Sequence, residues 1–269
     1  MWRRYYSKVW MVLFCLLVHS PLYAGSQQRT HQSNFNIEDV VPFAKQVERY
    51  AANKGARVFI IARLGSPKAD LPEGIEFTHV GLAVYSDIKI SDTETVQGYA
   101  IHNLYQDPNA LDVSRLVLDY PVDFFMGAVE LKAGILIPTP KLQRKLLQSL
   151  TLGRNVKLHN ASYSIVSNPY SSTYQNCTEH ILDLLFSAIY DTDSIPQLKV
   201  NQVAYFKAQM IRVSPFKRLL APMFSADIKM EDQGAILQVA TFTSISKFLN
   251  DYGLLTANVL VDSHGVKEF

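Results

Sequence analysis

The sequence predicts an α+β fold in which a helix packs across an antiparallel sheet. Four short segments rich in apolar residues are separated by polar or turn-forming segments, which is typical of strands in a sheet. Elsewhere apolar residues recur at helical spacing, most clearly in the stretch YQNCTEHILDLLF at 174–186. There Cys177 opens the predicted helix and Asn176 precedes it as an N-cap residue. The four strand segments are residues 56–65, 76–86, 95–105 and 130–138.

The first 24 residues have the composition of a secretory signal peptide. Three basic residues and no acidic one precede the apolar run VWMVLFCLLV at 9–18, and Ala24 offers a processing site. Because this run is short for a membrane span, we expect cleavage near residue 24 and a periplasmic product without a span. An uncleaved anchor is the alternative. Residues 25–38 are expected to form a flexible lead into a single domain at 39–269, with a C-terminal elaboration from about residue 198.

The order of elements follows from capping and turn signals. An amphipathic helix is expected over 39–53, with Pro42 in its first turn. Residues 119–128 suggest a short helix, and Thr139 with Pro140 marks the beginning of another. The remaining predicted elements are a helix over 198–210, a strand over 234–241, a helix from Thr243 that ends at Gly253, and a closing strand over 257–262.

Charge and cysteine content narrow the class of function. The chain has 26 Lys and Arg against 24 Asp and Glu, and removal of the signal leaves 23 against 24, so no nucleic-acid surface is expected. Cys15 leaves with the signal, which makes Cys177 the only cysteine of the mature chain. A lone thiol in an exported protein suggests a function, and a helix N-terminus should lower its pKa. The structural alternative is a small buried residue at the start of a core helix.

Two histidines on neighbouring strands could serve this thiol. If the hairpin is symmetric about its loop, His79 opposes His102 on a face of glycine and alanine, with Cβ atoms about 5 Å apart. His79 could then act as the base and His102 could orient it. Asn103 is the competing orienter, although the same alternation puts it on the opposite face. The structural alternatives are a hydrogen-bonded core histidine for His79 and a solvated strand-end residue for His102.

The order of these motifs resembles a known superfamily. THVGLAVY (78–85), YAIHNLY (99–105) and QNCTEH (175–180) follow one another as in circularly permuted, NlpC-like members of the papain fold. QNCTEH is also similar to the NCEH motif of lecithin retinol acyltransferase-like proteins, with one extra residue between Cys and Glu. A closer resemblance, over most of 40–250, is to an exported bacterial family described only as a domain of unknown function. These resemblances imply a permuted papain-like fold.

Several further residues are weaker candidates. Gln175 and Asn176 could help the backbone N–H of Cys177 to hold an oxyanion, although Asn176 could be only a cap. Tyr174 could line a cleft. Cys177 and His180 have the spacing of zinc ligands, but the sequence lacks a second close Cys or His pair, so we expect no metal and no cofactor.

Together these features predict an exported thiol hydrolase or acyltransferase that cleaves an amide or ester through an acyl-enzyme. Cys177 would be the nucleophile, His79 the base and acid, and His102 the orienter. Glu179 and Asp183 are expected to be solvated. The compartment suggests a cell-envelope substrate, whether peptide, peptidoglycan or lipid. The alternative is a non-catalytic binding or assembly domain that keeps the papain-like fold.

Overall fold

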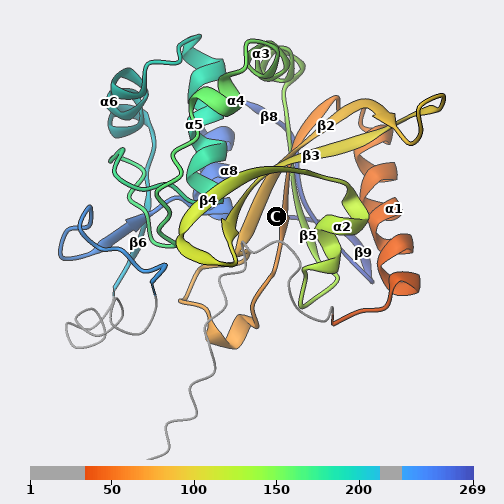
Figure 1. Ribbon diagram of the computed structural model, residues 1–269, viewed down its shortest axis with the longest axis horizontal. Helices are drawn as coiled ribbons and strands as arrows, with labels where there is room; N and C mark the ends of the chain where they lie inside the picture. The colour runs from red at the N-terminus through yellow and green to blue at the C-terminus, as the bar shows by residue number, and fades with distance from the viewer. Residues whose placement is uncertain (1–33, 213–225) are drawn as a thin grey trace, which may run out of the picture.

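The central element is a seven-stranded antiparallel sheet. The computed structural model describes residues 34–212 and 226–269 (Figure 1). Within them the strand order is β4-β3-β2-β1-β5-β8-β9, and every neighbouring pair is antiparallel. The predicted α+β class and antiparallel sheet are therefore confirmed. The strands are β1 Val58–Arg63, β2 His79–Lys89, β3 Thr95–Asp107, β4 Ala110–Asp119, β5 Ala133–Pro138, β8 Leu255–Asp262 and β9 Gly265–Glu268.

Helices cover both faces of the sheet. One face packs against α1 and α2, and the other packs against α3, α5 and α8 (Figure 1). This explains why β1 is apolar throughout: Phe59 and Ile61 face α1, while Val58 and Ile60 face α5. The helices are α1 Ile37–Asn53, α2 Pro121–Met126, α3 Pro140–Thr151, α4 Arg154–Lys157, α5 Cys177–Tyr190, α6 Ile195–Tyr205 and α8 Phe242–Asp251, with a 3₁₀ turn, η1, at Lys68–Asp70.

The helix ends agree with the sequence signals in part. Thr139 caps α3 by accepting a hydrogen bond from the backbone of Leu142, as predicted. By contrast α1 begins at Ile37, two residues early, so Pro42 lies beyond the first turn and removes a backbone hydrogen bond there. The cap of α8 is Thr241 rather than Thr243, because Thr241 forms a reciprocal capping box with Ser244.

The region after residue 198 contributes to two sheets. Only residues 198–205 of the predicted helix over 198–210 are helical, in α6, and its last residues lie in β6 at Gln209–Ile211. This strand pairs with β7 at Leu237–Val239 in a separate two-stranded sheet, which holds the predicted strand over 234–241. The predicted closing strand over 257–262 lies in β8, which pairs with β5, but it does not close the sheet, because the unpredicted β9 follows and pairs with β8.

The predictions for the N-terminal part of the chain lie outside the elements described above. The signal peptide at 1–24, and the lead as far as residue 33, lie outside the described residues. In the part of the chain that the structure describes, no helix is both long and apolar enough to cross a membrane. The edge strand β4 had no counterpart in the sequence prediction, because most of its residues are exposed or half-buried and it lacks a strong apolar face.

Candidate functional site

Cys177 is the first residue of α5, as the sequence predicted. Asn176 caps this helix: its Oδ1 accepts hydrogen bonds from the backbone N–H groups of Thr178 and Glu179, at 3.1 and 3.0 Å. Its Nδ2 donates to the carbonyl of Ile165 at 3.1 Å. Both polar atoms of Asn176 therefore hold the start of the helix, which supports its role as a cap.

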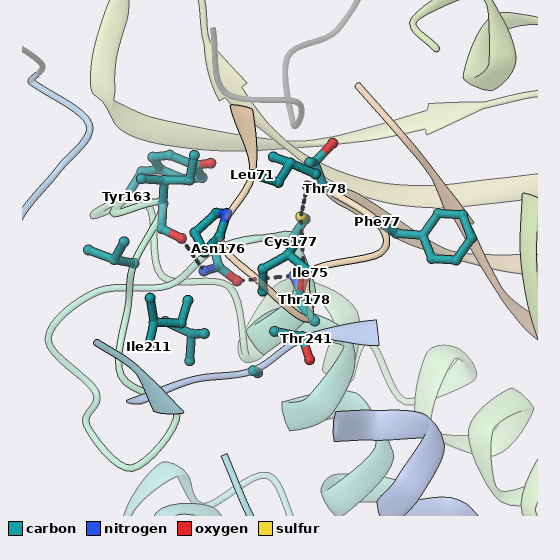
Figure 2. Close-up of a pocket in the computed structure, with 15 residues that line it drawn as sticks. Leu71, Ile75, Phe77, Thr78, Tyr163, Asn176, Cys177, Thr178, Ile211 and Thr241 are labelled. Atoms are coloured by element: carbon teal, nitrogen blue, oxygen red, sulfur yellow. Dashed lines mark hydrogen bonds between the residues drawn. The ribbon is translucent and has the colours of Figure 1, made fainter. Parts of the chain in front are cut away.

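The thiol of Cys177 lies against the beginning of β2. Sγ is 3.9 Å from the carbonyl oxygen of Thr78 and 3.8 Å from Oγ1 of Thr178 (Figure 2). Burial raises the pKa of Cys177, while hydrogen bonds from the backbone of Val80 and from Thr178, and the charge of Arg63, oppose the rise. The lowered pKa that the helix N-terminus predicted is thus wrong in direction, because removal of the thiolate from water outweighs these contributions.

His79 is fully buried at the first position of β2. Its ring stacks on Tyr105, with centroids 4.7 Å apart and planes 11° from parallel. Nε2 lies 3.1 Å from Oδ1 of Asn103, and Nδ1 has no hydrogen-bond partner. Since Oδ1 can only accept, Nε2 carries the proton and Nδ1 presents a lone pair. Burial lowers the pKa of His79 well below its usual value, the charge of Arg63 lowers it further, and the Asn103 hydrogen bond opposes both, so the imidazole is neutral.

The thiol and the imidazole approach the same strand end from different faces of the sheet. Cys177 packs with Leu104 on the face that α5 covers, whereas the ring of His79 lies against Tyr105 and Phe124 on the α2 face. Sγ makes no hydrogen bond to either ring nitrogen, although it contacts the carbonyl of the residue that precedes His79. The expectation that both residues share one small-residue face is therefore wrong.

The register of the β2–β3 hairpin causes this difference. The turn is centred on Asp92, with the backbone of Ile90 donating to the carbonyl of Glu94, and His102 pairs with Leu82. The prediction paired His102 with His79, three residues away in register. A shift by an odd number moves a side chain to the other face, so His102 points away from His79 and cannot orient it. Asn103, the competing candidate, makes that contact instead.

A buried polar network holds Asn103 in place. Its Nδ2 donates to Oδ2 of Asp119 at 3.4 Å, and the hydroxyl of Tyr105 donates to the same oxygen at 2.6 Å. Burial raises the pKa of Asp119, while the Tyr105 hydrogen bond opposes the rise. The network thereby fixes which end of the Asn103 amide faces His79.

Arg63 lies beside this network and was missed by sequence reasoning. It pairs with His79 in the sheet register, is 1% exposed, and lies over the ring of Phe124 at 5.4 Å. A Cβ on Gly127 would overlap the guanidinium group of Arg63, so any larger residue there would require Arg63 to shift. The available signal was an arginine inside the otherwise apolar strand VFIIAR.

The other predicted site residues point elsewhere. The side chain of Gln175 donates to Asp183 at 2.7 Å and accepts from the backbone of Asn160 at 2.9 Å, so it faces the far side of α5. The hydroxyl of Tyr174 donates to Glu231 at 3.1 Å, and Tyr174 lines a different pocket from Cys177. Neither residue approaches the thiol.

Two carboxylates of α5 are buried, contrary to the expectation that they are solvated. Lys199 from α6 covers them, with Nζ 2.8 Å from Glu179 and 2.9 Å from Asp183. Burial raises the pKa of Glu179 to about 8, although the nearby lysine opposes this rise. The helix is therefore enclosed on its polar side as well as its apolar side.

His180 contacts Asn155, with Nε2 2.9 Å from Oδ1. Across residues 34–212 and 226–269, no group of three or more His, Cys, Asp or Glu side chains is arranged to hold a metal ion. The Cys177–His180 spacing therefore has no further ligands beside it in that part of the chain.

The fold and the site define an α+β protein with a buried cysteine at the start of a central helix and a histidine–asparagine pair at the neighbouring strand end. A family model described as an uncharacterized protein conserved in bacteria, DUF2145, matches residues 50–249. This match covers most of the chain, which therefore belongs to that family, as the resemblance to a bacterial family of unknown function predicted. Neither the curated proteins nor the solved structures contain a match to this chain.

Proposed function

We propose that the protein is an exported thiol hydrolase or acyltransferase with a permuted papain-like arrangement, in which Cys177, His79 and Asn103 act together. The observation that carries this proposal is the state of the His79 ring. Nε2 is held by Asn103 while Nδ1 is buried without a partner. An unpaired buried acceptor costs about 1–3 kcal/mol, so a thiol S–H brought within reach would relieve this cost by donating a hydrogen bond to Nδ1.

The reaction would proceed through a thioester. Sγ of Cys177 attacks the carbonyl carbon of an amide or ester, and the thiol proton passes to Nδ1 of His79. The bond from carbon to the leaving nitrogen or oxygen then breaks, and the leaving group takes that proton. Water, or an acceptor alcohol or amine, attacks the thioester, gives its proton to His79 and releases the acyl product as Sγ regains a proton. The backbone N–H of Cys177 would hold the oxyanion.

This chemistry requires Sγ and Nδ1 to meet at the end of β2. Catalytic hydrogen bonds are often long in ligand-free enzymes and shorten when substrate binds. The thiol contacts the residue that precedes His79, but the two side chains lie on different faces of the sheet, so the proposal requires Sγ or the ring to move around the end of β2. A cell-envelope substrate and a periplasmic location form part of the proposal, because the expected signal peptide would deliver the protein there.

The direct test is labelling of the purified mature protein with an acyl-type thiol probe. Wild type should be labelled at Cys177, and His79→Ala should lose most of the labelling while remaining folded. His159→Ala is a matched control, because His159 lies away from the thiol and bonds to Ser114. Equal labelling of wild type and His79→Ala would contradict the proposal.

A non-catalytic binding domain is the second candidate. Two observations favour it: the raised pKa of Cys177 and the approach of the thiol and His79 from different faces. In that case Cys177 fills space at the start of α5. The folded protein would then resist acyl probes entirely, and Cys177→Ala would change stability without any loss of ligand binding.

A further inference from the structure

Cys177 lies in the wall of a pocket that is mostly apolar and uncharged (Figure 2). None of its fifteen lining residues is Asp, Glu, Lys, Arg or His. Aliphatic and aromatic side chains come from segments far apart in the sequence, including Ile75 and Phe77 before β2, Ile165 before α5, and Val239 in β7. The thiol therefore opens onto a shared apolar surface rather than onto a charged one.

Three of the polar side chains in this wall already have hydrogen-bond partners. Both polar atoms of the Asn176 side chain hold the start of α5. Oγ1 of Thr78 accepts a hydrogen bond from the backbone of Gly65 at 2.7 Å, and Oγ1 of Thr241 bonds to Gln209 at 2.8 Å. A sugar or a carboxylate has more polar groups than the remaining donors and acceptors of this mostly apolar wall can match, so its burial here would be unfavourable.

The size of the pocket limits its occupant. Its volume is about 180 Å³, whereas pockets for drug-sized ligands are usually larger, about 300–1,000 Å³. An apolar cavity of about 150 Å³ can hold one benzene molecule. The pocket next to Cys177 thus suits a single apolar group of about six to eight carbon atoms, which would be one part of a larger substrate.

We propose that this pocket binds the acyl part of the substrate, an apolar group of about six to eight carbon atoms next to the carbonyl that Cys177 attacks. This inference rests on the proposed function for its role in the reaction, but the binding itself does not require catalysis. A short fatty acyl chain and a leucine- or phenylalanine-like acyl group share this chemistry. A glycan or an acidic stem peptide next to the carbonyl does not fit it.

Binding to Cys177→Ser protein tests the pocket without any reaction at the thiol. The probes are neutral N-methylalkanamides of two to twelve carbons, N-acetyl-leucine and N-acetyl-phenylalanine N-methylamides, and N-acetylglucosamine, each measured by calorimetric titration. Each added methylene should tighten Kd about fourfold until the pocket is full near six to eight carbons, after which affinity should level off. Tighter binding of the linear series would indicate a fatty acyl source, and tighter binding of the amino-acid amides a peptide source.

Two substitutions localise the effect. Ile165 is 38% exposed at the pocket, so Ile165→Asp should fold and should weaken binding of the best amide about tenfold or more. Val156→Asp is the matched control, because Val156 is 71% exposed on α4 and does not line the pocket. Ile75→Ala should move the plateau to longer chains by about three carbons, the number removed.

Several results would overturn the inference. The inference fails if Kd does not depend on chain length or if no amide binds. It also fails if N-acetylglucosamine binds as tightly as the best amide, or if Ile165→Asp and Val156→Asp change the Kd of that amide equally. Chain-length-dependent binding together with no acyl-probe labelling of the wild type would keep the pocket and refute the catalytic role. Acyl-probe labelling of the wild type without chain-length-dependent binding would support the catalytic role and refute the pocket.

Discussion

Replacing Asn103 with alanine should show which residue orients His79. The substitution leaves the Nε2–H of His79 buried without its acceptor, which costs about 1–3 kcal/mol. It also removes hydrogen bonds from Nδ2 to the carbonyl of Ile101 and to Asp119. We therefore expect the free energy of unfolding to fall by about 2–4 kcal/mol, measured by urea denaturation. His102→Ala, at a half-buried position on the other face, should cost about 1 kcal/mol or less.

Stability alone would not show an orienting role, so two labelling rates must be compared. Acylation by a probe ester needs proton transfer through His79, whereas alkylation by iodoacetamide needs only the thiolate. Asn103→Ala should slow acylation about tenfold to a hundredfold relative to alkylation, because the ring is then free to turn or change tautomer. His102→Ala should leave the ratio unchanged. The reverse pattern, with acylation lost only in His102→Ala, would refute the assignment of Asn103.

Three other expectations follow from the structure. Burial raises the pKa of Cys177, so only a small fraction of its thiol is ionised below about pH 8.5. The alkylation rate should therefore rise about tenfold per pH unit through about pH 8.5. A rate that stays constant at acidic pH would contradict this. Gly127→Ala should destabilise the protein by about 1–3 kcal/mol, because its Cβ would displace Arg63. Gly234→Ala is the control and should leave stability unchanged, because its Cβ would meet no described atom within 4 Å. The midpoints of urea denaturation test both substitutions. N-terminal sequencing of the exported protein should show cleavage near residue 24, and an intact Met1 in the cytoplasm would count against export.

The sequence predicted the sheet because its central strands are short apolar runs bounded by turn-forming residues. Residues 56–65 and 130–138 hold β1 and β5, whose side chains are buried throughout. Register was not predictable in the same way, since it depends on where the hairpin turns. The chain turns around Asp92, where Ile90 and Glu94 pair through the backbone, and no side-chain pattern in 86–95 specifies that centre. One wrong register exchanged the faces of His102 and Asn103.

The buried charges were the least predictable part of the site. Glu179 and Asp183 look like the solvated face of a helix, and only the later α6 brings Lys199 over them. The same is true of Asp119 and Tyr105, which meet because β4 pairs with β3, and β4 itself was not predicted. Tertiary pairing, rather than local pattern, decides where these polar groups lie.

Arg63 bears on how the proposed site could work. Its buried charge favours the thiolate of Cys177 and disfavours the imidazolium of His79, so its effects on a thiolate–imidazolium pair oppose each other. Burial, the larger cause at both residues, penalises both ions. The resting state is therefore not a preformed ion pair between the Cys177 thiolate and the His79 imidazolium. A thiol at an exposed helix N-terminus would instead favour such a pair. Proton transfer to Nδ1 would have to accompany the attack on the carbonyl, because only then does the developing charge pass to an oxyanion near the start of α5.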